Sequence, residues 1–227
     1  MKINHISDTH GLLPKLKGKF DMIIHTGDLF PNSKNFKSSD PDRNEKEAKF
    51  QEEWLYGILN EFKTWIGNYP FAFVPGNHDF IDPRKFIDIL QNNGIKAYNL
   101  SDKITKINGL NFYGFPYIPP VNGYTTWMYE KKGEEMMVEI RKMVDKLNST
   151  FVDVIASHGP IYQCLDKNAE HEECGNGFMR KAIDFSIHRD MVPRYFLHGH
   201  IHESQGITVR NCMLVSNAAC SQHIISL

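Results

Sequence analysis

Short apolar runs recur along the chain, and five of them are followed at once by a cluster of Asp, His, Asn and Gly residues. Runs of this length, rich in Ile, Val and Phe, are typical of buried β-strands. The polar residues that follow mark the point where each strand ends and a loop begins. The five junctions are KINHIS before Asp8, FDMIIH before Thr26, FAFV before Pro75, VDVIA before Ser157 and RYFL before His198.

Three stretches between the strand candidates have the spacing of amphipathic helices. Residues 83–92 begin with Pro83, which suits a first helical turn, and Asp82 could cap them. Residues 44–66 and 130–147 repeat apolar positions every three or four residues, which predicts one buried face on each helix. These apolar positions are Phe50, Trp54, Ile58, Leu59 and Phe62 in the first helix, and Met136, Met137, Ile140, Val144 and Leu147 in the second.

Strands that alternate with helices predict an α/β fold. After residue 94 short strand candidates follow one another closely, with an Asn108-Gly109 turn signal, so we expect a second, more antiparallel set of strands beside the first. The polar stretch 31–45 is interpreted as one exposed loop. Because no repeat, low-complexity tract or linker divides the chain, a single domain over residues 1–227 is predicted.

Composition narrows the function classes. With 227 residues, 41% hydrophobic and 23% charged, the chain has the composition of a soluble globular protein, and its formal net charge of -1 indicates no general attraction to nucleic acid or membrane. The four cysteines form no CxxC pair, which favours a reduced cytoplasmic protein, although Cys164 and Cys174 could pair in one loop. The opening MKINHISDTH leaves no room for a signal peptide, and no apolar run reaches the ~20 residues of a membrane span.

The five polar endings together carry carboxylate, carboxamide and imidazole side chains and no thiolate. Open α/β sheets place their sites at the carboxyl ends of strands, so these side chains are expected to meet. Mixed nitrogen and oxygen donors suit Mn, Fe, Zn, Co or Ni, and there are too many donors for one tetrahedral ion. A shared carboxylate that joins two ions would use them economically. The candidates are Asp8, His10, Asp28, Asn77, His78, Asp79, His158, His200 and His202.

The order Asp-x-His, Gly-Asp, Gly-Asn-His-Asp, His-Gly and Gly-His-x-His over residues 8–202 resembles the calcineurin-like metallophosphoesterase superfamily. More narrowly, HTGD, SHGP, HGHIHES and the aromatic GFPYIPP segment resemble its MPPED-like branch, which is similar to class III cyclic-nucleotide phosphodiesterases. The resemblance implies a four-layer αββα sandwich, in which two mixed β-sheets pack together with helices outside. It also implies two divalent metal ions, with manganese expected and Fe, Zn, Ni or Co as alternatives.

The same resemblance implies a role for each matching residue. Asp28 would bridge the two ions, and His78 would be the catalytic histidine near the phosphate. A metal-bridging hydroxide would then hydrolyse a phosphodiester bond of a small substrate, such as a cyclic nucleotide. His198 is expected to be a bystander. The first ion would be held by Asp8, His10 and His202, and the second by Asn77, His158 and His200.

The chain departs from one branch of that superfamily. Protein Ser/Thr phosphatases continue their second block as Gly-Asp-x-x-Asp-Arg-Gly, whereas here LFPNSKN follows Asp28, so a phosphatase of that type is not expected. A nuclease or phosphomonoesterase of the same fold remains an alternative, and so does a non-catalytic binding scaffold. Complete metal-ligand blocks argue against the scaffold. The near-neutral charge argues against a nuclease, because tracking phosphates needs clustered Lys and Arg.

Two features allow more than one interpretation. Asp79 could orient His78 or a metal ligand, or it could cap the turn that follows it. The segment 115–130 carries three tyrosines and a tryptophan among prolines, and these rings could stack on a nucleobase or pack against their own sheet. These side chains are Tyr117, Tyr124, Trp127 and Tyr129.

Overall fold

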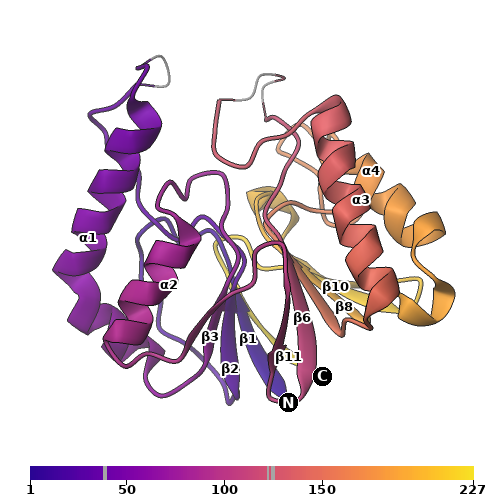
Figure 1. Ribbon diagram of the computed structural model, residues 1–227, viewed down its shortest axis with the longest axis horizontal. Coiled ribbons are helices and arrows are strands. Elements are labelled where there is room, and N and C mark those ends of the chain that lie inside the picture. The colour runs from indigo at the N-terminus through magenta and orange to yellow at the C-terminus, as the bar shows by residue number, and fades with distance from the viewer. Residues whose placement is uncertain (38–39, 122, 124–125) are drawn as a thin grey trace.

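A computed structural model describes residues 1–37, 40–121, 123 and 126–227. Two mixed β-sheets lie face to face, with helices on both outer faces (Figure 1). This arrangement confirms the α/β sandwich expected from the resemblance. Side chains from both sheets form the central core layer, including Ile3 and Ile24 from one sheet and Phe112, Val154 and Leu197 from the other.

The first sheet has the strand order β11-β1-β2-β3-β4. Strands β1 to β4 run parallel, and β11 pairs antiparallel with β1 at the edge. The first and last strands of the chain are therefore neighbours, which brings the two termini close together (Figure 1). The strands are β1 (Lys2–Ile6), β2 (Met22–His25), β3 (Phe71–Phe73), β4 (Ala97–Asn99) and β11 (Gln222–Ser226).

The second sheet has the order β5-β6-β7-β8-β10-β9. Its inner pairs β6–β7, β7–β8 and β8–β10 are parallel, and only the two edge strands pair antiparallel. The second, more antiparallel set of strands expected after residue 94 is confirmed in part: this sheet is antiparallel at both edges and the first sheet at only one, but β4 and β11 join the first sheet. Its strands are β5 (Ile104–Ile107), β6 (Leu110–Phe115), β7 (Val154–Ser157), β8 (Tyr195–His198), β9 (Gly206–Arg210) and β10 (Met213–Asn217).

Helices α1 and α2 cover the first sheet, and α3 and α4 cover the second (Figure 1). The predicted cap of α2 is confirmed, because the Asp82 carboxylate accepts the Arg84 backbone N–H. A π-helical turn (Ala182–Ser186) continues α4, and two short 3-10 helices (Arg189–Met191 and His202–Ser204) follow. The helices are α1 (Arg43–Ile66), α2 (Pro83–Asn92), α3 (Gly133–Ser149) and α4 (Gly177–Lys181).

Helix α1 packs most of its predicted face against the first sheet, because Phe62 is buried and Trp54, Ile58 and Leu59 contact the same core. The prediction did not include the polar residues that this helix also buries. The buried face carries Arg43, Glu47 and Gln51 in its first half and apolar residues such as Leu55 and Phe62 only later. The stretch 31–45 is likewise not one exposed loop, because Arg43 is buried where α1 begins.

The four cysteines are free, so the optional Cys164–Cys174 disulfide is not formed. None of the described helices combines the length and apolar character that crossing a membrane requires.

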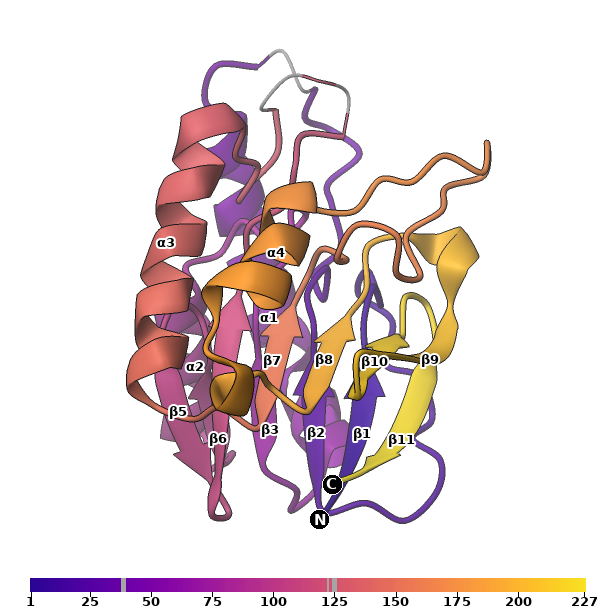
Figure 2. The same ribbon diagram turned by 90° about the vertical axis from the view of Figure 1, so that its right-hand side faces the viewer.

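The parallel strands explain why the polar endings meet. Strands β1, β2, β7 and β8 point to the same end of the sandwich (Figure 2). Loops that leave this end carry Asp8, Asp28 and His158, as well as the pair His200 and His202. Packing the two sheets face to face therefore brings side chains from both sheets to one edge, as open α/β sheets generally do.

Candidate metal centre

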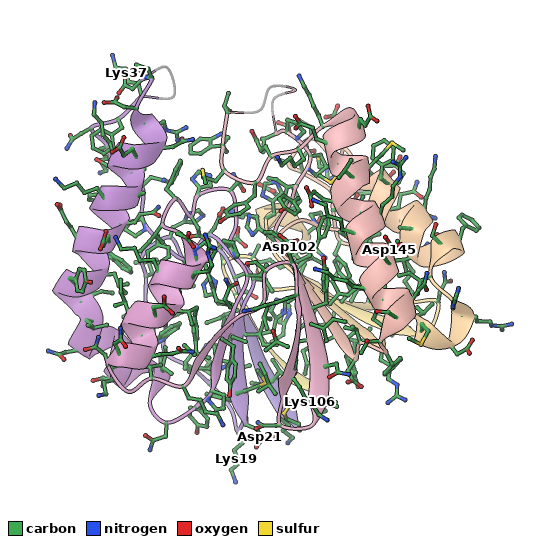
Figure 3. The ribbon with its side chains drawn as sticks, viewed as in Figure 1. Lys19, Asp21, Lys37, Asp102, Lys106 and Asp145 are labelled. Atoms are coloured by element: carbon green, nitrogen blue, oxygen red, sulfur yellow. The ribbon has the colours of Figure 1, made fainter. Side chains whose placement is uncertain are left out.

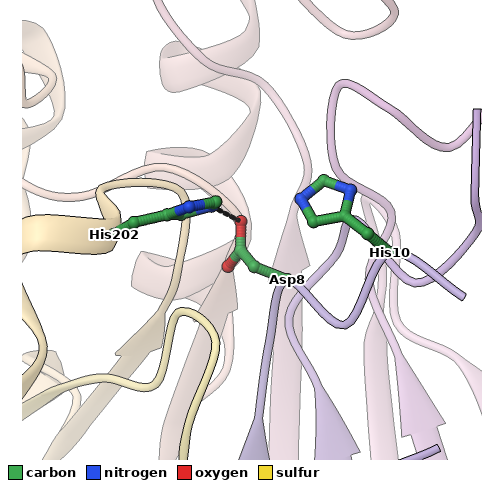
Figure 4. Close-up of side chains that lie close together, drawn as sticks. All are labelled: Asp8, His10 and His202. Atoms are coloured by element: carbon green, nitrogen blue, oxygen red, sulfur yellow. Dashed lines mark hydrogen bonds and ion pairs between the residues drawn. The ribbon is translucent and has the colours of Figure 1, made fainter. Parts of the chain in front are cut away.

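The first cluster of candidate ligands joins the loop after β1 to the loop after β8. One nitrogen or oxygen atom from each of Asp8, His10 and His202 lies within 4.8 Å of the others. The His202 Nε2 atom lies 3.3 Å from Asp8 Oδ1, and His10 faces the same carboxylate from the other side (Figure 4). The side chains of His10 and His202 are 34% and 44% exposed, so this cluster lies on the open side of the site.

The second cluster is more deeply buried. Ligand atoms of Asp28, His158 and His200 also lie within 4.8 Å of one another. His158 Nε2 is 3.4 Å from Asp28 Oδ2 and 3.0 Å from Asn77 Oδ1, which places Asn77 with this cluster. Its other ring nitrogen, Nδ1, lies 2.8 Å from the Thr26 carbonyl, and a carbonyl there orients the ring so that Nε2 points into the cluster.

Asp28 lies where the two clusters meet. Its Oδ2 atom is 3.4 Å from His158 Nε2 in the second cluster and 4.0 Å from His10 Nε2 in the first. The His200 backbone N–H donates to Asp8 Oδ2 at 2.9 Å, which also ties the clusters together. The structure thus gathers all seven side chains that the sequence proposes as ligands.

Burial and neighbouring charges shift the side-chain pKa values of the second cluster in opposite directions. Burial alone would raise the pKa of the Asp28 carboxyl, but His158, His78 and His10 together outweigh burial and lower that pKa. Burial likewise disfavours a charged His158, yet Asp28 raises the pKa of His158 above its usual value. Burial lowers the pKa of His200 to about 3, so this imidazole is neutral near pH 7. Because histidine binds metals in its neutral form, a divalent cation here would displace the proton on His158.

The backbone at the clusters is strained. Left-handed backbone costs a non-glycine residue roughly 1 kcal/mol or more and persists only where the surroundings enforce it, often at functional sites. A methyl group on Gly76 would overlap Asp28 Oδ1, and one on Gly199 would overlap Asp8 Oδ2, so glycine is required where the backbone approaches the carboxylates. Four candidate ligands have positive φ angles, namely Asp8 (55°), His10 (45°), Asp28 (53°) and His200 (73°).

The donor chemistry fits divalent metal ions. Each cluster offers a carboxylate and two imidazoles, and Asn77 adds an amide oxygen to the second cluster. Buried carboxylates together with imidazoles suit borderline divalent ions rather than a structural zinc site built on thiolates. The exposed His10 and His202 leave an approach from solvent.

Asp79 holds the loop that carries Asp28. Its carboxylate accepts four backbone N–H groups, from Asp28 (2.7 Å), Leu29 (2.9 Å), Phe30 (3.1 Å) and Gly76 (2.7 Å). These contacts do not engage the His78 ring, and they go to residues 28–30 and 76 rather than to the turn that follows Asp79. Of the two interpretations open from sequence, these contacts favour support of a candidate ligand. Asp79 supports Asp28 by binding its backbone N–H and does not contact its carboxylate.

Replacing Asp79 with asparagine should destabilise the protein by about 3 kcal/mol, because an amide cannot accept all four buried N–H groups and leaves some without a partner. Urea unfolding of the variant would measure the loss. Asp145→Asn, on the exposed face of α3 (Figure 3), is a matched control that should change stability little. Equal stability of the Asp79 variant and the wild type would show that these hydrogen bonds contribute nothing net.

His78 is held on its backbone and on its ring. Its backbone N–H donates to Asp28 Oδ1 at 2.7 Å, and its carbonyl accepts from Gln51 Nε2 at 2.7 Å. Ring atom Nδ1 is in short contact with Asn32 Oδ1. Because Asn32 engages Nδ1, Nε2 is the ring nitrogen that can exchange a proton or hydrogen bond with a bound ligand.

Trp127 packs against the His78 ring at a centroid distance of 4.1 Å. The Arg43 guanidinium lies 3.9 Å from the centroid of the Trp127 ring, and Arg43 also donates to the Thr126 carbonyl. The Glu130 carboxylate fixes this loop by accepting the backbone N–H groups of Thr126 and Trp127. His78 and Arg43 already contact the Trp127 ring, so packing rather than nucleobase stacking describes this side chain.

Other aromatic residues of the same segment also pack within the protein. The Tyr117 hydroxyl donates to Asp102 Oδ2 at 2.8 Å, and the Tyr117 ring packs against Phe115. Tyr129 packs against Tyr117. Tyr124 lies outside the described residues.

Sequence reasoning missed Gln51, which ties α1 to two loops of the site. Its amide N–H groups donate to the carbonyls of Pro31 and His78, and its carbonyl accepts from the backbones of Phe80 and Ile81. A signal was present, because the polar residues at 43, 47 and 51 continue the four-residue spacing of the buried Leu55. Asn32 and Trp127 had no such signal, since their contacts depend on loops.

His198 is buried and belongs to neither cluster, in agreement with the expected bystander role. Its Nδ1 atom faces the carbonyl of Gly199.

Comparisons with known proteins agree with these features. A family model described as calcineurin-like phosphoesterase matches residues 1–204. Human metallophosphoesterase domain-containing protein 1 is 22% identical over 243 residues, which cover 94% of this chain and 64% of the human protein, so the chain spans less than two thirds of that relative. A UPF0046 protein of Caenorhabditis elegans is 28% identical over 229 residues, covering 98% of this chain and 71% of the nematode protein.

Among solved structures, the crystal structure of the protein TT1561 of Thermus thermophilus has a similar fold. The TM-score is 0.58 at 16% sequence identity, and the match covers 96% of this chain and 88% of that one. At this identity the likeness concerns the fold alone.

Proposed function

The chain belongs to the calcineurin-like phosphoesterase family, and from that premise we propose that it is a phosphodiesterase with two divalent metal ions, acting on a small substrate. The observation that carries the proposal is the pair of adjacent ligand clusters with the Asp28 carboxylate between them. Cyclic nucleotides are one candidate substrate class, and manganese is the proposed metal. We further propose that residues 1–227 act as one domain, in the cytoplasm.

In this proposal Asp8, His10 and His202 hold one ion, Asn77, His158 and His200 hold the other, and Asp28 contacts both. Bound there, the ions would neutralise charge on the phosphate oxygens and make a water nucleophile available near neutral pH. His78, next to Asn77 in the chain, would place Nε2 toward the phosphate and give a hydrogen bond or a proton to the leaving oxygen. Asn32 and Trp127 would keep the ring in that orientation.

A substrate panel tests the proposal. Protein stripped of metal with a chelator and reloaded with Mn is offered bis-p-nitrophenyl phosphate, p-nitrophenyl phosphate, cyclic nucleotides and DNA. We expect diester hydrolysis that requires the added metal. A preference for the monoester, or for DNA, would overturn the assignment to small diesters. No hydrolysis with any of Mn, Fe, Zn, Ni or Co would favour the non-catalytic scaffold.

A further inference from the structure

A groove of about 630 Å³ lies beside the first ligand cluster, between residues 12–18 and strand β11. Its volume is in the range of sites that bind small molecules, roughly 300–1,000 Å³. The roles proposed above for the metal ligands and His78 make no use of it.

The groove is built by a loop that is pinned in place although it has no regular secondary structure. The Trp65 indole N–H donates to the Pro14 carbonyl at 2.7 Å and anchors the loop to α1. The Gln222 side chain accepts the Lys17 backbone N–H at 2.9 Å and donates to the Lys15 carbonyl at 3.0 Å, which anchors it to β11. Because both walls are held by hydrogen bonds, the space between them is preformed.

The lining combines exposed apolar side chains with uncharged polar ones and one cation. Leu12 and Ile224 are 72% and 37% exposed, respectively, and Pro14 lies with them in the wall. Among the described residues that line the groove, Lys17 is the only one to present a charged side chain, because the Asp8 side chain is fully buried. This lining suits a ligand in which an apolar group is attached to an anion. Among the described lining residues there is no exposed carboxylate that would repel the anion.

The groove adjoins the first ligand cluster through Asp8 and Cys220, which both line it. Cys220, which lines one end, places Sγ 3.6 Å from His202 Nδ1 and 3.5 Å from the Asp8 carbonyl. This contact follows from the pairing of β1 with β11, which brings the segment before β11 next to the segment after β1. His10 and His202 are the exposed members of the clusters, so a phosphoester held there has the groove as its neighbour.

We propose that this groove binds an apolar alkyl or aryl ester group of the phosphodiester substrate, the group that stays on phosphorus during hydrolysis. The inference rests on the proposed phosphodiesterase function and names the substrate class: diesters with one elongated, apolar substituent. In the reaction, the oxygen of water bonds to phosphorus as the bond from phosphorus to the other ester oxygen breaks. A proton from water ends on that leaving oxygen or in solvent, the alcohol or phenol departs, and the apolar monoester remains in the groove until it dissociates.

Two substrates that release the same leaving group test the groove. Methyl p-nitrophenyl phosphate and octyl p-nitrophenyl phosphate both lose p-nitrophenolate and differ only in the group that stays on phosphorus. We expect kcat/KM of the wild type to be at least ~10-fold higher for the octyl diester, since each well-buried methylene contributes to discrimination. Equal kcat/KM for both diesters would overturn the inference.

Three variants test whether the preference for the octyl diester arises in the groove. Ile224→Asp and Leu12→Asp each put a carboxylate into the groove and should abolish the octyl preference through KM, while hydrolysis of the methyl diester stays within about twofold. Ile207→Asp, at a strand position 49% exposed and outside the groove, is the matched control and should keep the preference. An octyl preference that survives both groove variants would place the apolar group elsewhere.

A binding measurement separates this inference from the proposed function. The aryl sulfonate 1-anilinonaphthalene-8-sulfonate should fluoresce on binding wild-type protein and the Ile207→Asp control, without added metal, and much less with the two groove variants. If neither diester is hydrolysed under any metal condition, the proposed function fails, and this fluorescence difference alone decides whether the groove is an apolar binding site. Equal fluorescence in all four proteins would overturn the inference that the groove binds apolar groups.

Discussion

Replacement of Asp28 by asparagine is expected to lower diester hydrolysis by about 10³-fold or more, the scale on which removing a single charge-stabilising group acts in an active site. The side chain is 2% exposed and lies between His10 of one cluster and His158 of the other. An amide of the same shape keeps the volume but loses the negative charge that both ions would share. Metal content per chain, measured by mass spectrometry after reloading with Mn, should fall together with turnover.

The Asp145→Asn variant serves as the control for the lost charge, because Asp145 lies on the outer face of α3, away from both clusters (Figure 3). Its metal content and turnover should match those of the wild type. An Asp28→Asn protein that binds two ions and retains turnover would show that Asp28 is not the shared ligand. Thermal unfolding in the presence of a chelator would show whether the variant folds without help from a metal.

Replacement of His78 by alanine should leave metal binding intact and lower turnover by ~10²–10⁴-fold, the usual contribution of a general acid or base. The reason is that the His78 ring contacts Asn32 and Trp127 and belongs to neither ligand cluster. Loss of turnover should be larger for a diester with a poor alkyl leaving group than for one that releases p-nitrophenolate, because a good leaving group needs less protonation.

His188→Ala is a suitable control, since His188 is exposed immediately before the 3-10 helix Arg189–Met191. It should change neither metal content nor turnover. Loss of metal from His78→Ala would assign His78 to ligand binding or to support of the site. An equal loss for good and poor leaving groups would remove the proton-transfer role and leave only stabilisation of phosphate charge.

The pool of candidate metal ligands could be proposed from sequence, because local pattern carries that information, whereas the separate roles expected for Asp28 and His78 came from the resemblance to the calcineurin-like family. An apolar run followed by Asp, His or Asn shows where a strand ends, and parallel strands must end at one edge. The donor types indicate the class of metal in the same way. The capped helix at residues 83–92 was likewise predictable, since Asp82 and Pro83 act on the backbone beside them.

What only the tertiary structure decided depends on contacts between residues that are distant in the chain. The strand order placed β4 and β11 in the first sheet, and no local pattern encodes strand order. The role of Asp79 required the loop after β2 to lie across the loop after β3, 50 residues away. The Trp127 ring was a candidate for nucleobase stacking until Arg43 and His78 were found against it.

The histidines after β8 show what local sequence pattern determines and what tertiary contacts determine. The sequence by itself determined that His200 and His202 follow a buried strand in a glycine-containing turn, because hydrophobic pattern and turn chemistry act over a few residues. The tertiary structure alone decided their partners: His202 lies with Asp8 and His10, and His200 with Asp28 and His158. It also placed Cys220 beside His202 and beside Asp8, which is 212 positions away, because the first strand pairs with the last.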